Sequence, residues 1–94
     1  AEPSIRFDAT SFLALLQKFR KYGYLEDAEK ILKVLIQQNK TGKMDEILAR
    51  EQLLLARCFY NKSDILKAKH TLEWCKEVYP QTSSAKEAKK LAMY

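Results

Sequence analysis

Apolar residues recur at intervals of three and four along most of this chain, in five separate segments. This spacing places apolar side chains on one face of an α-helix. It predicts helices at about residues 9–22, 25–38, 45–60, 64–78 and 85–93, after an irregular leader at residues 1–8. The third has apolar residues around more of its circumference than the others, so we expect it to be the central helix.

Residues that cap or stop helices stand between these segments. The chain has only 2 Gly and 2 Pro, which favours an all-α fold with short connections. Acidic residues in the first turn of the second helix suit its dipole. The predicted boundary residues are Asp8 or Thr10, Gly23, Gly42, Ser63 as the N-cap of the fourth helix, Pro80, and Thr82, Ser83 or Ser84.

The first two helices and the turn between them recur at an offset of 40 residues. About six of these residues form an extra loop around residues 41–46, which leaves a unit of about 34. The aligned pairs are Leu15 and Leu55, Leu16 and Ala56, Phe19 and Phe59, Gly23 and Ser63, Leu25 and Ile65, Ala28 and Ala68, Leu32 and Leu72, and Leu35 and Cys75.

A 34-residue unit with these positions resembles the tetratricopeptide repeat. The resemblance implies two antiparallel helical hairpins, at residues 9–42 and 49–82, stacked as a short α-solenoid with a capping helix at residues 83–94. Small residues such as Ala28, Ala56 and Ala68 would allow close helix crossing. The first unit departs from the pattern at Leu16, Leu35 and Lys40, so we expect a looser crossing there.

Two other readings remain open. A plain helical bundle would have the same five helices. Residues 10–28 also resemble a pentatricopeptide repeat, whose arrays bind single-stranded RNA, and the excess of basic residues suits nucleic acid. Ala14, near the position expected to read a base, has no polar side-chain atom, and the second unit does not follow that pattern.

The net charge of +5 lies on alternate helices. The second and fourth are neutral, whereas the first, third and fifth carry the surplus. In the tetratricopeptide family these alternate helices line a concave groove, and the resemblance places eight residues on it: Leu13, Gln17, Arg20, Lys21, Arg50, Leu53, Arg57 and Tyr60. Four cations beside apolar side chains suit a partner segment with carboxylates and apolar anchors.

These patterns favour a non-enzymatic protein-interaction or scaffold module over an enzyme. His70 has no evident catalytic partner, and no spacing indicates a metal site or cofactor. Cys58 and Cys75 stand among apolar residues, so we expect both thiols to be buried, reduced and inert. Trp74 is expected to be half-buried or to face a neighbour.

A length of 94 residues suits one domain, and no apolar run is long enough to span a membrane. With no signal peptide visible, we expect an intracellular protein, cytoplasmic or nuclear. Self-association is a further possibility, because two units are fewer than usually stabilise a solenoid.

Overall fold

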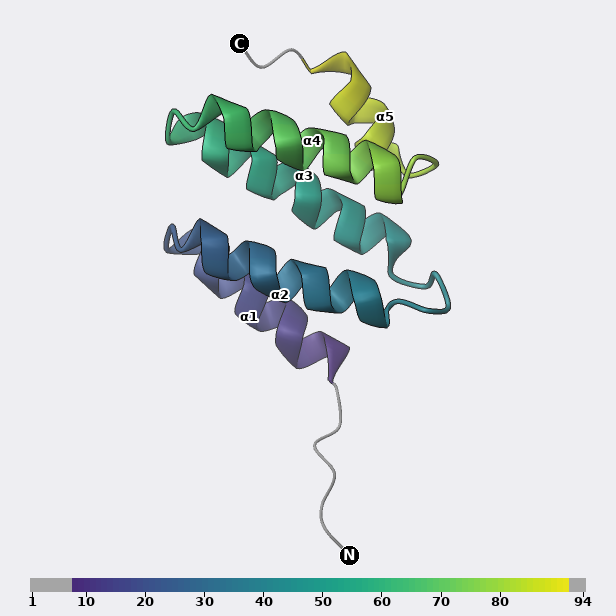
Figure 1. Ribbon diagram of the computed structural model, residues 1–94. Helices are drawn as coiled ribbons and strands as arrows, with labels where there is room; N and C mark the ends of the chain where they lie inside the picture. The colour runs from purple at the N-terminus through teal and green to yellow at the C-terminus, as the bar shows by residue number, and fades with distance from the viewer. Residues whose placement is uncertain (1–7, 92–94) are drawn as a thin grey trace, which may run out of the picture.

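The computed structural model describes residues 8–91, which form five α-helices and no β-strand. They are α1 (Ala9–Lys21), α2 (Leu25–Gln38), α3 (Asp45–Asn61), α4 (Ile65–Val78) and α5 (Ser83–Lys90). Figure 1 shows α1 and α2 as one antiparallel hairpin, α3 and α4 as a second hairpin beside it, and α5 next to the second. The predicted all-α class with five helices is confirmed.

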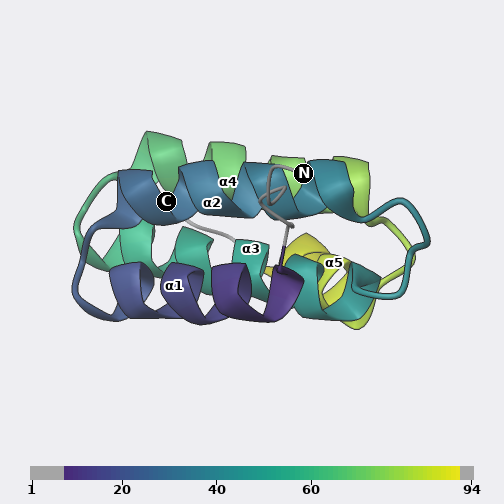
Figure 2. The ribbon, with the colours of Figure 1, turned by 90° about the horizontal axis from the view of Figure 1, so that it is seen from below.

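The helices are arranged in two layers. Viewed along the stack, α1, α3 and α5 lie in one layer, and α2 and α4 lie in the other (Figure 2). The hairpins are joined mainly where α2 packs on α3, and α5 packs on both α3 and α4. The third helix therefore contacts elements on several sides, as its apolar pattern predicted.

Both hairpin turns use a residue in the left-handed region of backbone space. Gly23 has a φ of 86°, and Ser63, 40 residues later, has a φ of 66°. Each turn is closed by an amide that donates back to a phenylalanine carbonyl: Tyr24 N to Phe19 O, and Asp64 N to Phe59 O, both at 2.9 Å. These are the same chain reversal at equivalent positions.

The prediction that Ser63 caps the fourth helix is therefore wrong. Its positive φ places it in the turn, and Asp64 is the N-cap, with a carboxylate that accepts from Lys67 N at 3.2 Å. The first helix is capped by Asp8, one of its two candidates, which accepts from Thr10 N and Ser11 N. Gly23 stops this helix as predicted.

The fifth helix begins earlier and ends earlier than predicted. Thr82 caps it by accepting from Ala85 N, so the helix starts at Ser83. It ends at Lys90, because Leu91 has extended backbone angles. The predicted end at Met93 lies outside the described residues.

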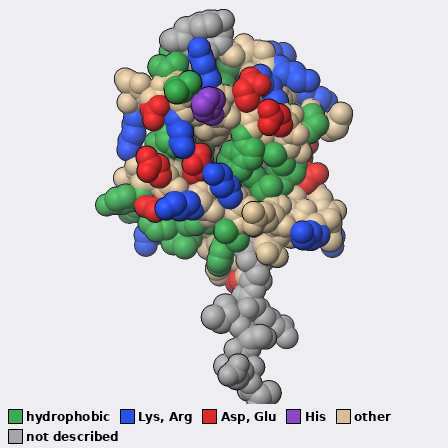
Figure 3. Space-filling model, in the orientation of Figure 1, with side chains coloured by type: hydrophobic (Ala, Val, Ile, Leu, Met, Phe, Trp, Pro, Cys, Tyr) green, Lys and Arg blue, Asp and Glu red, His purple; other side chains and the backbone are tan. Residues whose placement is uncertain are grey.

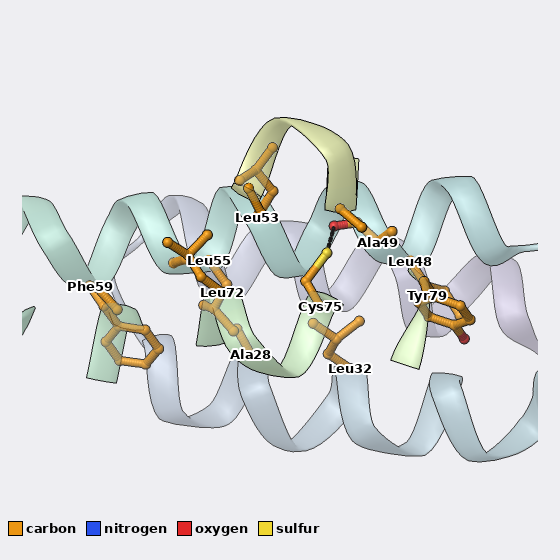
Figure 4. Close-up of a cluster of buried hydrophobic side chains, with 14 of the residues drawn as sticks. Ala28, Leu32, Leu48, Ala49, Leu53, Leu55, Phe59, Leu72, Cys75 and Tyr79 are labelled. Carbon is orange, nitrogen blue, oxygen red and sulfur yellow. Dashed lines mark hydrogen bonds between the residues drawn. The ribbon is translucent and has the colours of Figure 1, made fainter. Parts of the chain in front are cut away.

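The core is built from the small and large apolar residues that recur between the hairpins. Ala28, Ala68, Leu16 and Ala56 are all inaccessible to solvent. Figure 4 shows Ala28 and Leu32 of α2 in one cluster with Leu55, Leu72 and Cys75 from the second hairpin. This cluster holds the hairpins together through apolar packing.

Some apolar residues assigned to the core from sequence are exposed. Leu66 is 67% exposed and Val78 is 36% exposed, so their assignment to the inner face of the fourth helix was wrong. Leu15 is 43% exposed, although its counterpart Leu55 is fully buried. The difference arises because α3 lies between elements of both hairpins, whereas α1 lies at one end of the stack (Figure 1).

Candidate interaction face

The eight residues predicted to line a groove all lie on α1 and α3, but their surroundings differ. Gln17, Lys21, Arg50, Arg57 and Tyr60 are exposed, Leu13 and Arg20 are half-buried, and Leu53 is buried. The layer of α1, α3 and α5 therefore brings most of the set to one side of the molecule (Figure 2). Several of these side chains are already engaged within the chain.

A buried carboxylate on α3 takes up two of the predicted residues. Glu51 is only 4% exposed, and its two oxygens accept from Gln17 Nε2 at 3.1 Å and from Arg20 Nε at 3.2 Å. Arg20 Nη2 also lies 3.2 Å from Glu51 Oε1. A buried carboxylate needs such partners to offset the loss of hydration. Gln17 and Arg20 therefore tie α1 to α3, which lowers their availability for an acidic partner.

Sequence reasoning missed Glu51 as a structural residue. The available signal was the broad apolar coverage of the third helix, which makes every position on that helix a candidate for burial. A carboxylate in such a position requires a cation or an amide from a neighbouring helix. The sequence did not show which neighbour supplies it.

Arg57 has an intramolecular partner of a weaker kind. Its Nη2 lies 3.3 Å from Oε2 of Glu87 on α5, and the two side chains are 47% and 52% exposed. Exposed pairs of this type contribute about 0–1 kcal/mol to stability, because both groups remain hydrated. A carboxylate of a partner can therefore compete for Arg57.

Leu53 does not present an anchor to a partner. It is 4% exposed and belongs to the core cluster, and Figure 4 shows it beneath the α5 ribbon. Packing of α5 on α3 covers a position that the groove assignment left open. Substitution of Leu53 by Ala would be a change to the core, with a loss of about 2–5 kcal/mol in stability.

The residues of the candidate face that remain accessible are few. Lys21, Arg50 and Tyr60 are exposed, with Tyr60 at 39%, and Leu13 is half-buried against the core. Together with Arg57 they supply cations, a phenol and an apolar edge. We call these five residues the basic face.

Two surface hollows lie away from the basic face. The larger, of about 430 Å³, lies between the two hairpin turns, where Lys62 Nζ donates to the Gly23 carbonyl at 2.6 Å. The smaller, of about 260 Å³, lies between α2 and α4 and includes His70 and Trp74. Trp74 is half-buried there, as predicted. His70 is visible on this side of the molecule in Figure 3.

The described residues contain no group of three or more His, Cys, Asp or Glu side chains placed to hold a metal ion. Cys75 is buried, and its Sγ donates to Ala49 O at 3.6 Å. Burial raises the pKa of this thiol to about 11, although Lys76 acts in the opposite direction. Cys58 is only half-buried, and both cysteines are free thiols.

No described helix combines the length and the apolar character needed to cross a lipid bilayer. The chain matches no protein-family model, no curated protein and no solved structure. Functional inference for this protein therefore depends on its own geometry.

Proposed function

We propose that this chain is a non-enzymatic helical-repeat module, similar to tetratricopeptide repeats, that binds an acidic and apolar segment of a partner protein. The observation that carries the proposal is the recurrence of one hairpin. α2 and α4 have the same length and begin 40 residues apart, and both turns have the same left-handed residue and closing hydrogen bond. Stacked hairpins of this kind form extended surfaces suited to binding.

The basic face is the part of this surface best suited to the partner. Lys21, Arg50 and Arg57 provide cations, and Tyr60 adds an exposed aromatic ring. Arginine can bind a carboxylate through two parallel hydrogen bonds, and tyrosine is enriched at protein interfaces. Gln17 and Arg20 hold α1 against α3 and so support the shape of the face, and Leu53 supports it from the core.

The test is a titration of the chain with an extended peptide that contains alternating Asp and Leu residues, followed by amide chemical shifts. We expect shifts at the five residues of the basic face and a loss of at least tenfold in affinity for Lys21→Glu combined with Arg50→Glu. The matched control is Lys30→Glu with Lys40→Glu, which changes the net charge equally at two exposed residues outside the basic face.

Nucleic acid is the alternative ligand for a basic surface, and salt dependence separates the two. Phosphate contacts release counterions, so affinity for RNA or DNA falls steeply with salt. If single-stranded RNA binds more tightly than the acidic peptide and loses affinity steeply with salt, the proposal is wrong. Equal affinity of both charge-reversal pairs for the peptide would also overturn it.

A further inference from the structure

A second surface lies on α1, on the side directed away from the other hairpin. Leu15, Lys18, Phe19 and Tyr22 follow one another at helical spacing on this side, and Tyr24 lies beside them. Leu15 is 43% exposed, and Tyr22 and Tyr24 are 63% and 61% exposed. The Phe19 and Tyr24 rings make an edge-to-face contact, with centroids 6.2 Å apart. We call these five residues the outer face of α1.

The second hairpin shows what such a face accepts. Leu55 and Phe59 of α3 are the counterparts of Leu15 and Phe19, and they are 0% and 4% exposed. They are buried where the first hairpin packs against the second through α2 and α3, and Ala28 of α2 lies in the same cluster (Figure 4). The same positions are therefore covered by a helix in one hairpin and exposed in the other.

Hydrophobic side chains also gather along the lower edge of Figure 3, where the α1 and α2 hairpin lies. Exposure of neighbouring large apolar residues on one helix face is typical of an interaction surface. The packing of α2 on α3 indicates that the matching shape is an amphipathic helix.

Charge narrows the choice of partner. α1 has basic residues Lys18, Arg20 and Lys21 and no acidic residue, and Lys18 lies within the outer face. Two copies joined through this face would bring their Lys18 side chains into the same interface, and like charges repel there. A helix with acidic residues next to its apolar stripe would instead pair with Lys18.

We propose that the outer face of α1 is a second protein-binding surface that accepts an amphipathic helix with acidic residues beside its apolar stripe. Apolar residues of that helix pack on Leu15, Phe19 and Tyr22, and one of its carboxylates pairs with Lys18. This surface is distinct from the basic face, so either proposal can fail without the other.

The probe is a synthetic peptide with the sequence of residues 24–39, carrying Lys30→Glu and Lys33→Glu. This segment contains α2, which packs on the equivalent face of α3, and both replaced lysines are exposed in the chain. A second peptide replaces Glu26, Asp27 and Glu29 by Lys and retains both lysines. Fluorescence anisotropy of labelled peptide with the 94-residue chain gives the affinity.

We expect the acidic peptide to bind at least tenfold more tightly than the basic one. Leu15→Ser should reduce its affinity by at least tenfold, and Lys18→Glu should reverse the preference between the two peptides. The matched control is Leu66→Ser, which removes another exposed leucine, 67% accessible, from a different helix. Each variant's circular dichroism must match that of the unmodified chain.

Equal loss in Leu15→Ser and Leu66→Ser would overturn the proposal, as would tighter binding of the basic peptide to the unmodified chain. Sedimentation provides an independent test. If the chain is a dimer that Leu15→Ser converts to a monomer, the occupant is a second copy and the proposed acidic helix is wrong.

Discussion

Arg20 of α1 and Glu51 of α3 form an ion pair at 3.2 Å in which the carboxylate is almost fully buried. The two residues are 31 positions apart, and Gln17 shares the same carboxylate. A pair with one buried member is costly to break, because the remaining charge loses its partner without regaining water. Arg20 is therefore a structural residue as well as a member of the predicted groove.

Substitution of Arg20 by Met should lower the free energy of unfolding by about 3 kcal/mol, because Glu51 would remain buried without a cation. Urea denaturation measures this change. The control is Arg57→Met, which breaks the exposed pair with Glu87 and should cost at most about 1 kcal/mol. Combining Arg20→Met with Glu51→Leu should restore most of the loss, and similar losses for Arg20→Met and Arg57→Met would contradict the structural role.

Gln52 offers a route to a more stable chain. It is inaccessible to solvent, and neither its Oε1 nor its Nε2 has a hydrogen-bond partner. Replacing it by Leu should raise the free energy of unfolding by about 1–2 kcal/mol, because the buried amide no longer loses hydration on folding. Thermal and urea unfolding test this, with Gln37→Leu on exposed α2 surface as the control. A lower stability for Gln52→Leu would show that a buried water satisfies the amide.

The two hairpin turns predict opposite responses to the same kind of change. Ser63→Gly should stabilise the chain by about 0.5–1 kcal/mol, because glycine adopts a φ of 66° without steric cost. Gly23→Ala should destabilise it by about 1 kcal/mol or more, since φ is 86° there and a Cβ would lie 3.0 Å from Lys62 Nζ. Both changes are measured by urea unfolding. Ser63→Ala is the control and should give no gain.

The buried thiol of Cys75 should resist modification. With its pKa at about 11, only about 0.1% would be thiolate at pH 8. In Cys58→Ala, alkylation by iodoacetamide at pH 8 should therefore be slow in buffer and fast in urea. Rapid alkylation of the folded chain would contradict the burial.

The same shift predicts a pH dependence of stability. The folded pKa lies above the ordinary value of 9.0, so the stabilisation from the protonated thiol is complete below pH 9 and is lost as the pH rises toward about 11. Cys75→Ala should show a smaller loss of stability across this interval in urea unfolding. An identical pH profile for both chains would exclude Cys75 as its source.

The end of the second hairpin depends on another contact that the sequence did not reveal. Asn39 Nδ2 donates to Asp45 Oδ1 at 2.7 Å and to Tyr79 Oη at 3.0 Å, and its Oδ1 accepts from Met44 N. Asn39→Ala should lower the free energy of unfolding by about 1–3 kcal/mol in urea, because it removes bonds between the α2–α3 loop and the end of α4. The exposed Gln38→Ala is the control, and equal effects would show that the network adds no stability.

The sequence by itself determined the helices. The bounds of α2, the stop at Gly23 and the buried small residues Ala28 and Ala68 follow from spacing, turn residues and hydrogen bonds within a few positions. Such interactions are local, so a single sequence is enough to predict them. The 40-residue recurrence also appeared there, and the bounds of α2 and α4 bear it out.

Only the tertiary structure decided which side chains are accessible. Leu53 and Leu15 have similar sequence surroundings, yet α5 lies over the first and no hairpin covers the second in the described chain. Glu51 resembles any helical glutamate until α1 brings Gln17 and Arg20 to it. Burial and pairing of this kind depend on contacts between helices far apart in the sequence, and periodicity within one helix carries no information about them.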